Sequence, residues 1–132
     1  MRTINKIIIH CSATKANHDI TARDVRRWHL ANGWNDIGYH YFIRLDGTIE
    51  NGRPIEKIGA HTKGHNKDSI GICYAGGVAE NGTTLDTRTP KQKYALRALV
   101  ALIKEAEPHA TVHGHNEFSN KACPSFNVKT EL

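Results

Sequence analysis

The stretch Asn5-Lys6-Ile7-Ile8-Ile9-His10 contains three consecutive β-branched residues and shows no alternation of apolar and polar side chains. A continuous apolar run of this kind predicts a short strand that is buried on both faces, as in the middle of a sheet covered by helices. The run ends at His10. We therefore expect an imidazole at the carboxyl end of a central strand.

Further strand signals follow along the chain. Residues 39–45 and 48–51 flank the dipeptide Asp46-Gly47, which is a strong hairpin turn, so they predict an antiparallel pair. Residues 69–75 predict another core strand, closed by Gly76-Gly77, and residues 111–113 predict a short last strand. Residues 12–19, 59–66 and the tail from residue 114 onward are expected to be loops.

Two helices are expected between these strands. Thr21, followed by Asp24, forms an N-terminal capping pattern for a helix that ends near Asn32-Gly33. Thr89 and Pro90 begin a longer helix, which Pro108 stops. Strands and helices interleave, and the hairpin requires an antiparallel pair. The sequence thus predicts an α/β (mixed α+β) fold, with a central mixed β-sheet flanked by helices in a single domain of residues 1–132.

The composition excludes several classes of protein. The chain has 132 residues, of which 39% are hydrophobic and 23% charged, so it is neither a disordered tail nor a membrane protein. Its N-terminus lacks the apolar core of a signal peptide, which predicts synthesis in the cytoplasm. Three cysteines without a framework spacing argue against a disulfide scaffold. The nine histidines instead raise the question of a metal.

The formal net charge of +5 is spread along the chain. Its densest clusters, Arg23-Arg26-Arg27 and the basic residues of 88–97, are typical of solvated helix faces, and no aromatic residues interleave with them. We therefore expect no nucleic-acid partner and no stable membrane association, and we expect a monomer. A positive surface favours approach to an anionic polymer such as the bacterial cell wall.

His10, His115 and Cys123 lie at expected strand ends or in the tail. Two imidazoles and one thiolate make a three-ligand zinc set that leaves a fourth position open, as catalytic zinc requires. Spacing alone leaves open that these are ordinary strand-end and loop residues. His113, which shares a strand face with His115, is a spare ligand candidate.

Five short motifs occur in order and together carry a resemblance. They are His10-Cys11-Ser12-Ala13-Thr14, Gly38-Tyr39-His40-Tyr41, Ser69-Ile70-Gly71-Ile72-Cys73, His115-Asn116-Glu117 and Lys121-Ala122-Cys123-Pro124-Ser125-Phe126. In this order they resemble the zinc-dependent N-acetylmuramoyl-L-alanine amidases of the type 2 amidase family, which shares its fold with the peptidoglycan recognition proteins. Within that family the chain is most similar to the short phage lysozymes of the T7 type.

The resemblance implies Zn²⁺ as the cofactor, with His10, His115 and Cys123 as its ligands. It implies that Tyr39 and Lys121 are catalytic, and that His61 in Gly59-Ala60-His61 lines the substrate groove. The implied reaction is hydrolysis of the amide bond between N-acetylmuramic acid and L-alanine in peptidoglycan. The implied role is that of an endolysin, which reaches the wall after release through the membrane.

The chemistry is consistent with these residue types. Zinc polarises an amide carbonyl and acidifies a bound water, while a nearby ammonium and phenol stabilise the oxyanion that develops. The general base stays open between Glu50, Glu117 and other groups, with Glu117 better suited to orienting a backbone group or a ligand.

Two other functions remain as alternatives. A cytoplasmic recycling amidase would cleave the same bond in soluble anhydro-muropeptides. A noncatalytic peptidoglycan-binding module would commonly lack the ligand cysteine, so the presence of Cys123 favours an enzyme.

Overall fold

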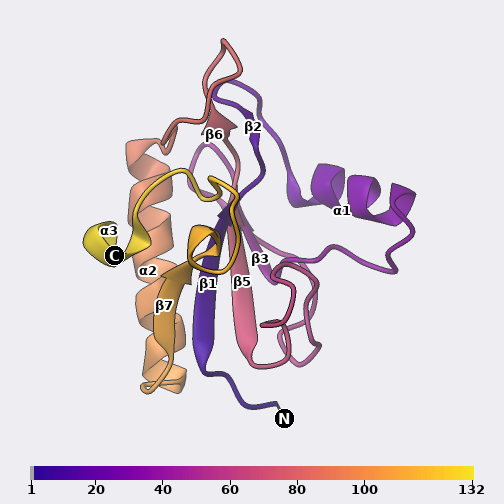
Figure 1. Cartoon of the computed structure of the whole chain (residues 1–132), viewed down its shortest axis with the longest axis vertical. Helices are drawn as coiled ribbons and strands as arrows, with labels where there is room; N and C mark the ends of the chain where they lie inside the picture. The colour runs from indigo at the N-terminus through magenta and orange to yellow at the C-terminus, as the bar shows by residue number, and fades with distance from the viewer. Residues whose placement is uncertain (1) are drawn as a thin grey trace.

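The computed structural model describes residues 2–132, which form a five-stranded mixed sheet, a separate two-stranded sheet and flanking helices (Figure 1). The order of strands in the larger sheet is β4-β3-β5-β1-β7, and β2 pairs with β6. The strands are β1 (Lys6–Cys11), β2 (Thr14–Lys15), β3 (Tyr41–Ile43), β4 (Ile49–Asn51), β5 (Ser69–Tyr74), β6 (Gly77–Val78) and β7 (Thr111–Gly114). The helices are α1 (Ala22–Ala31), α2 (Pro90–Ala106), the 3-10 turn η1 (His115–Glu117) and α3 (Val128–Glu131).

Strand β1 lies in the sheet between β5 and β7 and runs parallel to both. Ile7, Ile8 and Ile9 are completely buried, as the continuous β-branched run predicts. Strand β3 is parallel to β5 and antiparallel to β4, so the sheet is mixed. The predicted fold class, a central mixed sheet flanked by helices, is confirmed.

Helices α2 and α1 lie on opposite sides of the sheet (Figure 1). The larger core cluster joins side chains of β1 and β5 to the apolar stripe of α2, including Leu96 and Leu99. A smaller cluster on the other face joins Val25 of α1 to Phe42 and Cys73. Both helices begin at the expected N-cap residues, and the predicted capping box of Thr21 with Asp24 is present. Thr89 also forms a capping box, with Gln92, which was not predicted.

Three local predictions were wrong or incomplete. Strand β3 is shorter than the predicted 39–45 and begins only at Tyr41. The segment 12–19, expected as a loop, contributes β2, which pairs with β6. Strand β6 begins at Gly77, within the pair Gly76-Gly77 that was expected to close the preceding strand. The tail from residue 114 contains η1 and α3 rather than loop alone. Pairings of two residues and a four-residue helix are too short to leave a periodic pattern in the sequence.

The strand directions determine where the site lies. Because β1 and β7 are parallel, their carboxyl ends meet at one edge of the sheet, with Ile9 opposite Gly114. His10 follows Ile9 in β1, and His115 directly follows β7, so both imidazoles lie at this edge. No helix within residues 2–132 is both long and apolar enough to cross a membrane.

Candidate metal centre and active site

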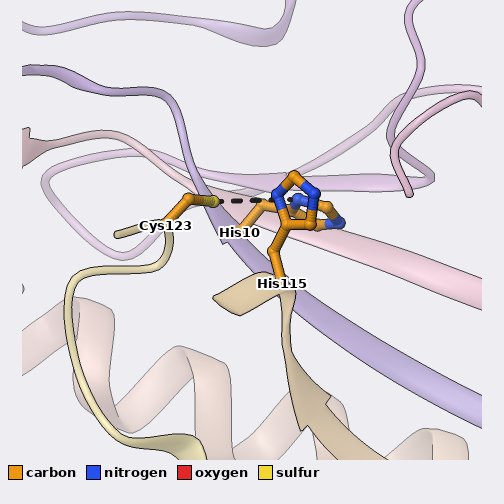
Figure 2. A group of neighbouring side chains, drawn as sticks. All are labelled: His10, His115 and Cys123. Atoms are coloured by element: carbon orange, nitrogen blue, oxygen red, sulfur yellow. Dashed lines mark hydrogen bonds between the residues drawn. The ribbon is translucent and has the colours of Figure 1, made fainter. Parts of the chain in front are cut away.

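His10, His115 and Cys123 converge at the carboxyl edge of the sheet, with one donor atom of each within 4.8 Å of the other two (Figure 2). His10 Nδ1 lies 3.8 Å from Cys123 Sγ. In a tetrahedral zinc site with Zn–N near 2.0 Å and Zn–S near 2.3 Å, neighbouring donor atoms lie about 3.3–3.6 Å apart. The donor set therefore fits a zinc ion after a small contraction.

The tail that carries Cys123 is fastened to the sheet by hydrogen bonds from side chains. Tyr74 Oη at the end of β5 donates to the carbonyl of Pro124 at 2.6 Å, and Ser125 Oγ donates to the carbonyl of Gly77 at 3.0 Å. The backbone N–H of Cys11 donates to Cys123 Sγ at 3.2 Å. These contacts hold the sulfur beside the end of β1.

The protonation states of the donors bear on metal binding. Burial, followed by the charges of His61 and His115, lowers the pKa of His10 well below its usual range, so its imidazole is neutral as a ligand must be. A hydrogen bond with Cys11, together with burial, raises the pKa of the Cys123 thiol. Binding of a cation there must therefore release a proton from the sulfur.

Next to the three donors lies a cavity of about 630 Å³. Its lining brings together the predicted residues Tyr39, His61, His115 and Lys121. The rest of the lining is His29, Trp34, Ala60, Thr62, Lys63, Asn66, Phe118 and Ser119. A cavity with this mixture of aromatic and cationic groups is suited to an extended ligand that carries carboxylates.

Tyr39 packs against the first of the three donors, with its ring centroid 5.1 Å from that of His10. Burial raises the pKa of the Tyr39 phenol well above its usual range. The phenol therefore remains protonated at neutral pH and can donate a hydrogen bond to an oxygen in the cavity.

Lys121 lies two residues before Cys123 and lines the same cavity as Tyr39. After burial, its positive charge is the next cause that lowers the pKa of His115. The positive charge of Lys121 is therefore felt at the histidine donors. An exposed lysine in this position can turn toward a bound substrate.

His61 borders the cavity and also contacts a donor residue. Its Nδ1 lies 2.9 Å from His10 Nε2, and the two rings meet edge to face. His61 is in the cavity lining, while its expected contact with substrate stays a prediction. Its direct contact with His10 was not predicted.

Neither glutamate considered as a general base belongs to the described lining of the cavity. Glu50 accepts a hydrogen bond from the N–H of Ala22 at the start of α1. Glu117 accepts from the N–H of Gly114 and contacts His113 Nδ1. As expected, Glu117 orients a backbone group.

Two other histidines have structural partners. His113 is not a third imidazole of the cluster, because its ring nitrogens contact Glu117 and Thr111. His40 is buried, and its Nδ1 accepts from the N–H of Gly71.

The sequence did not identify the aromatic wall of the cavity. Trp34 follows the end of α1 and packs against His29, with ring centroids 4.4 Å apart. His29 Nδ1 accepts a hydrogen bond from the N–H of Gly38, which fixes the ring beside Tyr39. A tryptophan directly after the helix-ending pair Asn32-Gly33 was the available signal.

Solved structures place this fold in a known class. The chain is similar to N-acetylmuramoyl-L-alanine amidase LysC from Clostridium intestinale, with 29% identity, a TM-score of 0.84, and coverage of 98% of this chain and 82% of that one. It is also similar to Drosophila PGRP-LB, with 30% identity, a TM-score of 0.79, and coverage of 94% and 76%. The fold is thus that of the amidases and peptidoglycan recognition proteins.

Sequence comparison narrows the class. The pattern that defines the family N-acetylmuramoyl-L-alanine amidase (Amidase_2) matches residues 1–126. The endolysin of Klebsiella phage KP32 is 44% identical over 125 residues, which cover 95% of this chain and 83% of that protein. The endolysin of Escherichia phage T7 is 42% identical over 93% of this chain and 82% of its own length. The chain belongs to the N-acetylmuramoyl-L-alanine amidase family, and the resemblance inferred from the five motifs is confirmed.

Proposed function

We propose that this protein is a zinc-dependent N-acetylmuramoyl-L-alanine amidase of the endolysin type, which acts on peptidoglycan as a single catalytic domain. The observation that carries the proposal is the convergence of His10, His115 and Cys123 beside a cavity that also contains Tyr39 and Lys121. Membership of the amidase family and similarity to phage endolysins over most of the chain support it.

His10, His115 and Cys123 would hold the metal. A zinc ion bound there would supply a Lewis acid that polarises the scissile carbonyl and acidifies a water molecule. The sulfur contributes negative charge to this donor set, which weakens that acidification relative to three neutral imidazoles. Other groups that stabilise the negative charge developing on the carbonyl oxygen would therefore increase the rate.

Tyr39 and Lys121 are suited to provide this stabilisation. The Tyr39 phenol is protonated, so its Oη–H donates a hydrogen bond to the oxygen on which negative charge develops. The Lys121 Nζ provides a positive charge in the lining of the same cavity. Both groups favour the tetrahedral state over the planar amide, which is what accelerates the reaction.

The cavity is suited to bind the stem peptide and its sugar. His61 lines the cavity, and Lys63 adds a second lysine to a lining that already contains Lys121. Stem peptides are anionic, so these lysines favour their approach. We expect the protein to act as a monomer, to be made in the cytoplasm and to reach the wall only after the membrane is breached.

The rival role is recycling of soluble anhydro-muropeptides, which breaks the same bond. Rates of cleavage measured on intact sacculi and on purified anhydro-muropeptides separate the two roles. The endolysin role predicts rapid solubilisation of sacculi. A protein that cleaves only the soluble fragments would instead be a recycling amidase, and one that binds sacculi without cleaving them in the presence of zinc would be a noncatalytic module.

A further inference from the structure

The donor atom that His10 presents to the metal centre determines the state of its other nitrogen. His10 Nδ1 is the nitrogen near Cys123 Sγ, so a metal held between them would bind Nδ1. A neutral imidazole ligated through Nδ1 carries its proton on Nε2. That Nε2 lies 2.9 Å from His61 Nδ1 and 3.3 Å from Thr62 Oγ1.

We propose that His61 is a positioning residue for the metal centre, which accepts the Nε2–H hydrogen bond of His10 and thereby fixes the tautomer and the ring plane of this ligand. The proposal rests on the proposed zinc-dependent function. It gives His61 a role that acts through His10 and is distinct from the substrate contact expected of a groove residue.

The tautomers along this chain of contacts are mutually consistent. If His61 accepts at Nδ1, its own proton is on Nε2, and that nitrogen lies 3.3 Å from Ser69 Oγ. Ser69 is fully buried at the start of β5 and can accept the bond. A directed series of hydrogen bonds thus runs from His10 through His61 to Ser69.

The His61 ring is held rigidly enough to orient another ring. Asn66 Oδ1 accepts hydrogen bonds from the backbone N–H groups of both His61 and Thr62, each at 2.9 Å. The ring lies over Gly71, where an added Cβ would come within 2.6 Å of ring carbons. The packing of β5 therefore prevents the ring from tilting toward the sheet.

Groups that orient a metal-ligating histidine through its second nitrogen commonly contribute 10- to 100-fold to metal affinity. His61 makes this kind of contact with the second nitrogen of His10. The His61 ring is held in place by Asn66 and by the packing of β5. We therefore expect the affinity of the folded protein for zinc, and not only its turnover, to depend on this residue.

The experiment compares zinc affinity, measured by competition with a chromophoric chelator, in the wild type and three variants. His61→Phe keeps a ring but removes the acceptor. His61→Asn restores an acceptor near the position of Nδ1, because Oδ1 of asparagine overlies that atom. His65→Phe is the matched control, since His65 is in the same loop but packs on Phe118 and has no contact with His10.

The proposal predicts that His61→Phe binds zinc about 10- to 100-fold more weakly, while His61→Asn and His65→Phe stay near the wild-type value. Zinc affinity of His61→Phe within twofold of the wild type overturns the positioning role but leaves the zinc site standing. A wild type that binds no zinc overturns both proposals.

A second measurement keeps the test decisive if the variants unfold. Imidazole ¹⁵N spectra of the zinc-loaded wild type report which nitrogen of His10 carries the proton. We expect the proton on Nε2, in slow exchange with water. A proton on Nδ1 would contradict the proposal.

Discussion

His10 Nδ1 lies 3.8 Å from Cys123 Sγ, although 113 residues separate the two in the sequence. The parallel strand β1 brings the imidazole to the carboxyl edge of the sheet, and the fastened tail brings back the sulfur. This long-range contact makes the zinc proposal testable one side chain at a time.

Replacing Cys123 with alanine should abolish tight zinc binding. The change removes the anionic donor and leaves two imidazoles, so we expect zinc affinity to fall by at least about 100-fold and cleavage of muropeptides to become undetectable. Equilibrium dialysis followed by elemental analysis measures the bound zinc. Cys73→Ala is the control, because Cys73 is a buried thiol outside the cluster; equal zinc loss in both variants would argue against a specific site.

Lys121→Ala should reduce turnover while zinc remains bound. Loss of one preorganised group that stabilises an oxyanion costs about 10²- to 10³-fold in kcat. Steady-state rates on a defined muropeptide, with zinc content determined in parallel, test this expectation. Lys63→Ala removes the other lysine of the cavity wall and should mainly raise KM, so a similar fall in kcat for both variants would contradict a specific role of Lys121.

Tyr39→Phe removes only the phenolic oxygen. We expect kcat to fall by about 10²-fold, because the hydrogen bond to the developing oxyanion is lost while the ring still packs against His10. Zinc affinity and the melting temperature should stay close to those of the wild type. Unchanged kcat would show that this hydroxyl takes no part in the reaction.

Arg88 should be a major contributor to stability. Its side chain is 2% exposed, pairs with Asp86 and Glu131, and stacks on Phe126 with the guanidinium carbon 3.5 Å from the ring centroid. It therefore ties the tail and α3 to the segment before α2, and Arg88→Met should lower the free energy of unfolding by about 2–3 kcal/mol.

Urea denaturation followed by circular dichroism measures that loss. Arg27→Met is the comparison, because the Arg27 side chain is 71% exposed in its pair with Asp24. We expect only a small change for Arg27→Met. Equal losses for the two variants would contradict the role assigned to Arg88.

His40 should make stability depend on pH in the mildly acidic range. Burial lowers the pKa of His40 from 6.5 to about 4, and the positive charges of Arg2 and Arg53 act in the same direction. Above pH 6.5 the His40 ring is neutral in both the folded and the unfolded protein. As the pH falls from 6.5 to about 4, only the unfolded chain binds a proton at this ring, so the folded protein loses stability. The loss reaches at most about 3 kcal/mol.

The measurement is urea denaturation of the zinc-free protein at several pH values across this range. His40→Asn keeps an acceptor near Nδ1 but does not titrate, so the stability of this variant should decline less steeply toward pH 4. The variant should be less stable than the wild type at neutral pH. Parallel pH profiles of variant and wild type would rule out this histidine as the source.

The elements predicted well from the sequence are those with strong local signals. The β-branched run of β1, the N-cap threonines of α1 and α2, and the Asp46-Gly47 turn each act over a few neighbouring residues. Strands β2 and β6 were missed because their pairing depends on residues far apart in the chain. Helix α3 has only four residues, fewer than a helix needs to form by itself, so packing on β7 determines it.

The residues of the candidate site also differ in how far the sequence alone predicts them. His10 and His115 follow from strand ends, because parallel strands bring their carboxyl ends together. The roles proposed for Cys123, Tyr39 and Lys121 required the family resemblance, since spacing left Cys123 open and no local pattern singled out the other two. Trp34, and the contact between His61 and His10, depend on how loops pack over the sheet, and no local pattern encodes that packing.

The most direct test of zinc-dependent amide cleavage is a zinc titration of the metal-free protein, with the products of a purified muropeptide identified by mass spectrometry. We predict that the rate of muropeptide cleavage rises in proportion to bound zinc and saturates at one equivalent. We also predict that the products are a saccharide with a free lactyl carboxylate and a peptide with a free L-alanine amino terminus. Full activity in the metal-free protein, or cleavage at another bond, would contradict the proposed function.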